Sequence, residues 1–179
     1  MARHPAAVLT AEEIRALLRL EAHPLEGGLF AETWRARESL DVASLRAGAP
    51  AVAAGVRAAG TAIYYLLTAG AFSAMHRLRW DEVFHFYLGD PVELLVLEPG
   101  GPGRIATLGV DLRSGMRPQV VVPAGAWQGA RLAAGGRVAL LGTTMAPGFD
   151  PADFEIGERE TLAAAWPRWR EPIERRTAR

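Results

Sequence analysis

Short runs of alternating apolar and polar residues, separated by glycine and proline, make up most of this chain. In the segment Leu29–Arg35, Phe30, Glu32 and Trp34 fall on one side of an extended chain and their neighbours on the other. This period of two is typical of β-strands. The pattern predicts strands at 29–35, 61–67, 72–78, 82–88, 92–97, 104–108, 119–122, 127–132 and 138–144.

The two ends of the chain follow other patterns. Thr10 and Glu13 form a capping box before apolar residues at helical spacing, which predicts a short helix over about 10–20. A second helix is expected over 158–165, ended by Pro167. We expect residues 168–179 to be a charged, frayed end with Arg175 and Arg176 in solvent, and residues 38–60 to form a loop or a loose hairpin.

Many short strands without intervening helices indicate a sandwich or closed barrel rather than a parallel sheet. The predicted fold class is therefore mainly β, with a short helix at each end. At 179 residues the chain is expected to be one domain, 1–179, with the barrel core at about 28–156.

Composition excludes several kinds of chemistry. The sequence contains no cysteine, so disulfides, thiolate nucleophiles and zinc–thiolate sites are absent. It contains no lysine, which excludes Schiff-base chemistry and a complete P-loop. The formal net charge is zero, so we expect neither a nucleic-acid nor a membrane partner. No signal-peptide pattern is seen at the start, and a cytoplasmic location is expected.

The segment from Gly70 to Gly89 holds the main candidate chemistry. His76 lies on one predicted strand and Glu82 begins the next, with a break at Trp80. If Glu82 points inward after that break, the two side chains meet inside the barrel. Phe84 and Phe86 share the face of Glu82, whereas His85 takes the opposite face.

These residues resemble the first motif of the cupin superfamily, in which glycine, His-x-His, glutamate and glycine follow at fixed spacing. Gly70, His76, Glu82 and Gly89 fit, but Leu78 replaces the second histidine. The second cupin motif is matched by Pro123 to Gly125, with Gln128 and Leu132 where a histidine and an asparagine are usual. Further blocks resemble the group known as cupin family five, of largely unknown function. They are His23–Gly28, Thr61–Leu67, Ser73–His76, Asp81–His85, Gly89–Leu94, Val122–Gln128 and Ala146–Asp150.

The resemblance implies a double-stranded β-helix, the jelly roll also seen in RmlC-like proteins, with a pocket inside the barrel. It also implies that the protein is commonly a homodimer. It does not imply a known reaction.

One interpretation is a metal site made by His76, Glu82 and Gln128. Imidazole and carboxylate suit zinc, iron, nickel or manganese. A typical metal cupin offers three histidines and one glutamate, and two of those histidines are missing here.

A second interpretation is a pocket for a small organic molecule. A buried His76–Glu82 pair would hold one imidazole tautomer and raise its basicity, as a general base requires. Some cupin-fold sugar-nucleotide epimerases pair such a histidine with a tyrosine acid, for which Tyr64 or Tyr65 is available. Other candidate ligand contacts are Phe72, Phe84, Phe86, Trp127, Gln128 and Arg35, the last for an anionic group.

A third interpretation is that His76 is a hydrogen-bonded core histidine in a non-catalytic binding or scaffold module. His23 and Glu26 lie in a turn that either approaches the barrel mouth or only caps it. The preferred prediction is small-molecule binding in the barrel, with a sugar or nucleotide-sugar epimerase or isomerase as the candidate activity. A divalent-metal cupin enzyme and a scaffold module are the alternatives.

Overall fold

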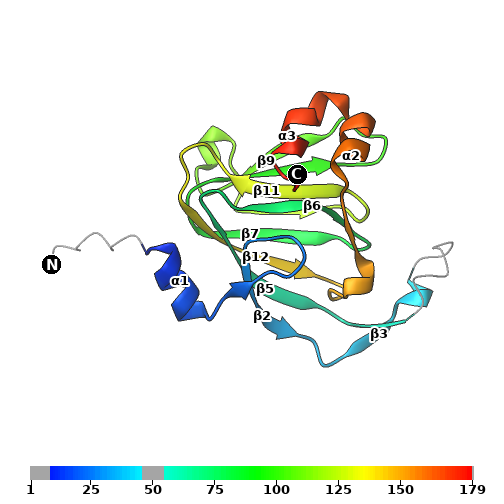
Figure 1. The fold of residues 1–179 in the computed structure, drawn as a ribbon. Helices are drawn as coiled ribbons and strands as arrows, with labels where there is room; N and C mark the ends of the chain where they lie inside the picture. The colour runs from blue at the N-terminus through cyan, green and yellow to red at the C-terminus, as the bar shows by residue number, and fades with distance from the viewer. Residues whose placement is uncertain (1–8, 46–54, 179) are drawn as a thin grey trace.

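The computed structural model describes residues 9–45 and 55–178. Two antiparallel sheets face each other across a shared core (Figure 1). The six-stranded sheet has the order β1 (Glu21–Ala22), β2 (Leu29–Arg35), β5 (Thr61–Thr68), β12 (Val138–Met145), β7 (Glu82–Gly89) and β10 (Gln119–Val122). The five-stranded sheet has the order β13 (Phe154–Ile156), β6 (Phe72–Leu78), β11 (Trp127–Leu132), β8 (Val92–Leu97) and β9 (Arg104–Leu108).

The mainly β fold confirms the prediction from the alternating pattern. Six predicted strands have the observed bounds, and β5, β7 and β12 each extend one residue further. Strand bounds are this predictable here because glycine and proline turns end the runs.

The main core lies between the two sheets. Tyr65, Leu67 and Leu141 contribute to it from the six-stranded sheet, and Leu94 and Val96 from the five-stranded sheet. Alternate residues of each strand point into this layer, because successive side chains in a strand take opposite faces.

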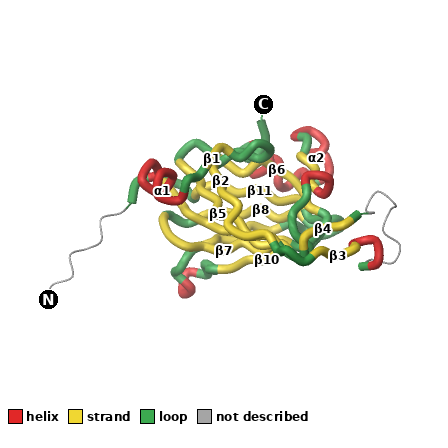
Figure 2. Tube along the Cα trace, turned by 90° about the horizontal axis from the view of Figure 1, so that it is seen from below, coloured by secondary structure: helices red, strands yellow, loops and turns green. Residues whose placement is uncertain are grey.

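The region 38–60 contains a small hairpin, which was one of the two predicted alternatives, a loop or a loose hairpin. Strand β3 (Ser39–Asp41) pairs with β4 (Val56–Ala58), and the residues between 46 and 54 lie outside the described part. Short 3₁₀ turns occur at Val42–Ser44, Leu112–Ser114, Pro151–Asp153 and Pro167–Trp169. In Figure 2 this hairpin and the first helix lie at opposite ends of the molecule.

Helix α1 (Ala11–Leu18) covers part of the outer face of the six-stranded sheet. The predicted capping box is present, with Thr10 and Glu13 bonded reciprocally. Ile14 packs against Leu66, Val138 and Leu140. None of the helices in the two described ranges has the length and hydrophobicity of a membrane span.

The C-terminal segment is packed through residue 178 rather than frayed, so the prediction of a frayed end with Arg176 in solvent was wrong, although Arg175 is exposed as expected. Helices α2 (Arg159–Ala165) and α3 (Arg170–Glu174) lie against the outer face of the five-stranded sheet (Figure 1). Ile173 is fully buried there, and Arg176 is only 1% exposed. The Arg176 carbonyl accepts a backbone hydrogen bond from Met75 of β6, and its guanidinium donates to the Glu93 carbonyl. The C-terminal segment is ordered because its backbone pairs with β6 and because Ile173, an apolar residue within a charged sequence, is buried.

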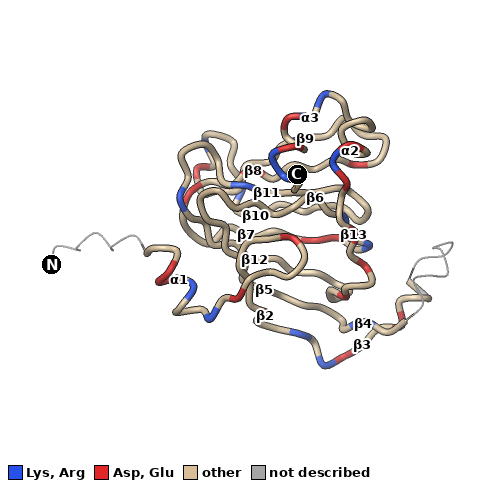
Figure 3. The backbone as a smooth tube through the Cα atoms, in the orientation of Figure 1, with Lys and Arg blue, Asp and Glu red and all other residues tan. Residues whose placement is uncertain are grey.

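Acidic and basic residues both occur on α1, α2 and α3 (Figure 3). This mixture agrees with the net charge of zero and with polar surfaces on the outer side of each helix.

Candidate functional site

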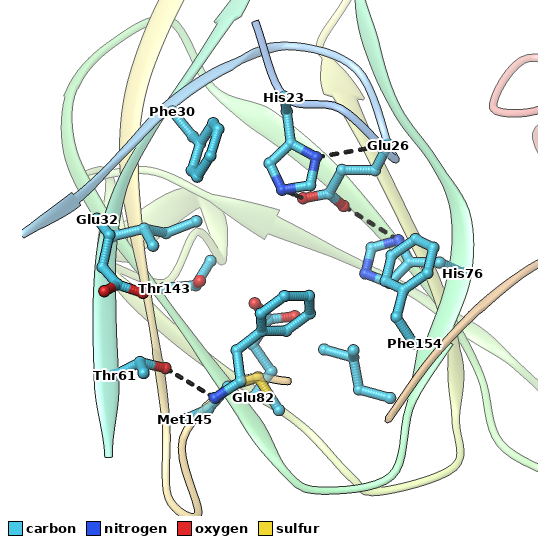
Figure 4. Close-up of a pocket in the computed structure, with 13 residues that line it drawn as sticks. His23, Glu26, Phe30, Glu32, Thr61, His76, Glu82, Thr143, Met145 and Phe154 are labelled. Carbon is cyan, nitrogen blue, oxygen red and sulfur yellow. Dashed lines mark hydrogen bonds and ion pairs between the residues drawn. The ribbon is translucent and has the colours of Figure 1, made fainter. Parts of the chain in front are cut away.

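A pocket opens at one end of the sandwich, between β2, β5 and β12 on one side and β6 and the segment 149–154 on the other (Figure 4). Its volume is about 60 Å³, several times the roughly 10–15 Å³ that one water molecule needs. The lining residues are His23, Glu26, Phe30, Glu32, Thr61, Ile63, His76, Leu78, Glu82, Thr143, Met145, Phe149 and Phe154.

Two strands bring His76 and Glu82 to this pocket. His76 and Leu78 are two residues apart on β6 and therefore share its inner face. After the break at Trp80, β7 begins at Glu82 with its side chain inward. Both groups are buried, with His76 2% and Glu82 7% exposed.

The turn from His23 to Gly28 places a third ionisable group in the pocket. Nδ1 of His23 accepts the backbone N–H groups of Leu25 and Glu26, so its proton is on Nε2. That Nε2 lies 3.6 Å from Oε1 of Glu26. The turn is thereby folded around the Glu26 carboxylate.

Glu26 reaches across to β6. Its Oε2 accepts a hydrogen bond from the Ser73 hydroxyl at 2.8 Å and lies 3.1 Å from Nδ1 of His76. The same Nδ1 is 2.8 Å from the carbonyl oxygen of Ala74. Two acceptors at one nitrogen require that Nδ1 carry the proton, which leaves the lone pair of His76 on Nε2.

The ring of Phe154 stacks on the imidazole of His76 and fixes its orientation. The two rings are stacked, with centroids 5.0 Å apart and planes inclined by 17°. Figure 4 shows His76, Phe154 and Glu26 together on one wall, with Glu32 and Thr61 opposite. The sequence pattern assigned control of the tautomer to Glu82, but the carboxylate at Nδ1 is that of Glu26.

Glu82 is bound instead by neutral donors. Nε2 of Gln128 donates to its Oε2 at 2.7 Å, and Thr143 also hydrogen-bonds to it. Gln128 is 1% exposed, and its Oε1 has no hydrogen-bond partner within the described residues.

Burial shifts the pKa of four buried groups, His23, Glu26, His76 and Glu82, in the same sense, toward neutrality. It raises the pKa of Glu26 and Glu82, and the mutual repulsion of the two carboxylates adds to the shift of Glu82. It lowers the pKa of His23 and His76, while the nearby Glu26 and Glu82 respectively oppose the change. The pocket thus combines a neutral imidazole with a carboxyl group that retains its proton more readily than usual.

Comparison with known families decides the identity of the fold. The family model described as Cupin superfamily (DUF985) matches residues 12–157. The chain belongs to the cupin superfamily. The predicted resemblance to this family is confirmed.

Solved structures of similar proteins cover this cupin almost completely. The X-ray structure of a protein from Shewanella oneidensis is 31% identical, covers 96% of this chain and 99% of its own, and has a TM-score of 0.80. A hypothetical protein from Leishmania major is 30% identical, covers 96% of this chain and all of its own, with a TM-score of 0.82. Oxalate decarboxylase from Bacillus subtilis is 15% identical over 87% of this chain and 36% of its own, with a TM-score of 0.50, a likeness of fold alone. No curated protein matches the sequence.

The other predicted ligand contacts of the cupin are spread over different places. Tyr65 points inward, Tyr64 outward, and the Tyr65 hydroxyl donates to the Gly27 carbonyl at 2.8 Å behind the pocket wall. Phe84 and Phe86 belong to the main core, deeper than the pocket. Arg35 lies at the rim, where it binds the lining residue Glu32.

Two aromatic candidates lie away from the pocket altogether. Trp127 packs beneath α2 and α3 on the outer face of the five-stranded sheet, with Arg77 over its ring. Its neighbour Gln128 is the register partner of His76 and takes the inner face, so Trp127 must take the outer one. Phe72 lines a separate surface cleft with Arg131 and Arg175.

Several lining residues were not predicted as ligand contacts. Phe30 and Glu32 are two residues apart on β2 and share one face, so the period of two could have predicted that they point the same way. Phe149 lies in a loop and Phe154 begins the three-residue strand β13, and neither segment is long enough to show a periodic signal.

The cupin fold implies a metal, and the donor groups present fit it poorly. Leu78 puts a hydrocarbon where the motif has its second histidine, and Gln128 directs its amide nitrogen at Glu82. Across residues 9–45 and 55–178, no group of three or more histidine, aspartate or glutamate side chains has the arrangement of a metal site. The set His76, Glu82 and Gln128 therefore does not form a ready metal site.

Proposed function

We propose that this cupin binds a small hydroxycarbonyl compound in its barrel pocket and isomerises it by proton transfer, with His76 as the base. One observation carries the proposal. Glu26 and the Ala74 carbonyl hold the proton of His76 on Nδ1, so the Nε2 lone pair is free to accept another. The lowered pKa of His76 keeps that lone pair available at neutral pH.

In the proposed reaction His76 and Glu82 each transfer one proton and recover their starting protonation states. Nε2 of His76 takes the proton from the carbon next to the carbonyl, and the released electron pair forms an enediol. The acid form of Glu82, favoured by its raised pKa, hydrogen-bonds the carbonyl oxygen and supplies its proton. His76 then returns its proton to the former carbonyl carbon. The hydroxyl group on the carbon that lost the first proton gives its proton to Glu82 and becomes the new carbonyl, which completes the isomerisation.

Isomerisation suits the pocket better than epimerisation. Inverting one carbon needs a proton donor on the face opposite the base, the role that the sequence offered to a tyrosine. Tyr65 donates its hydroxyl to Gly27 and does not line the pocket. A single base can serve a shift between neighbouring carbons on one face.

Hydrogen exchange tests the proposal without knowledge of the natural substrate. Hydroxyacetone is incubated with the protein in deuterium oxide, and loss of its CH₂ proton signal is followed by NMR. We expect catalysed exchange that His76→Gln lowers by about 10²-fold or more. The matched control is His85→Gln, a histidine outside the pocket. Exchange that is absent, or equal in both variants, would overturn the proposal.

The divalent-metal cupin enzyme is the alternative, supported by the free Nε2 of His76 and the Glu82 carboxylate at their motif positions. Titration of the native protein with zinc, iron, nickel and manganese tests this alternative. The scaffold alternative requires that no small molecule bind and that His76→Gln change only stability.

We also propose that the protein works as a homodimer. The outer side of β7 and β10 exposes apolar residues, with Tyr87 49% and Val121 48% exposed. A second copy of the chain would bury them. Light scattering of Tyr87→Glu should then show a shift from dimer to monomer, and an unchanged dimer would place the interface elsewhere.

A further inference from the structure

The polar lining of the pocket is rich in acids and acceptors. Three glutamates, Glu26, Glu32 and Glu82, line it together with the free Nε2 of His76. None of the lining residues within the described ranges is an arginine, and the sequence has no lysine. An anionic ligand would therefore meet no positive side chain in the wall.

The arginines near the mouth are already paired. Arg35 donates to both carboxylate oxygens of Glu32, and a third N–H goes to the Phe149 carbonyl. Arg57 donates to both carboxylate oxygens of Asp153. Since each guanidinium faces a carboxylate, neither leaves an uncompensated charge for a ligand.

The hydrogen-bond donors at the deep end of the pocket, Gln128 and Thr143, are already used by Glu82. Glu82 has only neutral partners, and Oε1 of the adjacent Gln128 is a buried acceptor left without a partner in the described structure. Glu82 and Nε2 of His76 present acceptor lone pairs to the pocket itself, so a ligand that brings hydroxyl hydrogens is favoured here.

We infer that the pocket selects an uncharged hydroxycarbonyl compound and excludes its phosphorylated or carboxylated counterpart. This inference rests on the proposed function for the reacting group but is carried by the lining itself. A phosphate group would enter a poorly solvated space beside the Glu26 carboxylate, where repulsion between like charges is strong, and the acid form of Glu82 offers it no positive charge. Sugar phosphates and nucleotide sugars are excluded for the same reason.

A matched pair of probes tests this selection. Hydroxyacetone and hydroxyacetone phosphate differ only in the phosphoryl group, and binding of each is measured by calorimetry and by thermal shift. We expect the uncharged compound to bind at least about tenfold more tightly. Equal or tighter binding of the phosphate ester, or no binding of either compound, would overturn the inference.

A charge variant shows whether the glutamates cause the selection. Glu26→Gln keeps the size of the side chain and removes its charge, so the preference for hydroxyacetone should fall by roughly tenfold. Glu98→Gln, an exposed carboxylate outside the pocket, should leave the preference unchanged. If Glu26→Gln does not fold, Glu32→Gln, at the other glutamate of the pocket lining, serves as the second variant. An unchanged preference in the folded variant would contradict the electrostatic cause.

The binding and exchange experiments distinguish failure of the charge selection from failure of the proposed isomerisation. Hydroxyacetone binding without deuterium exchange would refute the proposed isomerisation and leave the charge selection standing. If both compounds bind with similar affinity and exchange deuterium at similar rates, the charge selection is refuted and the proposed isomerisation stands.

Discussion

The carboxylate of Glu26 lies 3.1 Å from Nδ1 of His76, although Glu26 belongs to the turn before β2 and His76 to strand β6. Ser73 and His23 hold the carboxylate in place from two further directions. The contact determines which nitrogen of His76 faces the pocket.

Glu26→Gln should weaken control of the His76 tautomer. The neutral amide replaces a charged acceptor at Nδ1, so nitrogen-15 NMR should show a mixture of the two tautomers. Deuterium exchange of hydroxyacetone should fall by about 10–100-fold. Glu21→Gln, an exposed glutamate on β1, is the control. A single unchanged tautomer together with full activity would contradict a positioning role for Glu26.

Glu82→Gln should change how stability depends on pH. Burial raises the pKa of Glu82, so the folded protein holds this proton more tightly than the unfolded chain. Its ionisation therefore reduces the free energy of unfolding as the pH rises from about 4.5 through the folded pKa. The variant should gain stability relative to the native protein as the pH rises above about 4.5, measured by urea unfolding. A relative loss of stability of Glu82→Gln at the higher pH would contradict the raised pKa.

Ile173→Ala should destabilise the whole protein. Ile173 is fully buried against Met75, Leu95, Leu97 and Trp127, so removing its side chain leaves a cavity. The free energy of unfolding should fall by about 2–4 kcal/mol. Arg175→Ala, two residues away and exposed, should change it by less than about 0.5 kcal/mol. Similar small effects of both substitutions in urea unfolding would show that the tail does not support the sheet.

Restoring the missing ligands should create a metal site. Leu78→His with Gln128→His adds two imidazoles at the motif positions next to His76 and Glu82. Titration of zinc, iron, nickel and manganese by calorimetry should show binding at least about tenfold tighter than in the native protein. Micromolar binding by the native protein that disappears in His76→Ala would instead favour the metal-dependent alternative.

The position of a residue on a strand was predictable, but its depth in the barrel was not. The period of two correctly turned Phe84 and Phe86 inward, yet both lie in the main core below the pocket. Trp127 and Gln128 are neighbours on β11 and cannot share a face, so the prediction of both as ligand contacts was inconsistent with strand geometry.

The sequence by itself determined the strands, the turns, the cupin family and the inward direction of His76, because these depend on local alternation and on fixed spacing. It also excluded cysteine and lysine chemistry through composition alone. Tertiary structure decided that Glu26 rather than Glu82 contacts Nδ1 of His76, that Phe149 and Phe154 line the pocket, and that the charged tail is packed. These contacts join segments far apart in the chain through irregular turns, and no periodic pattern encodes where such turns bring their side chains.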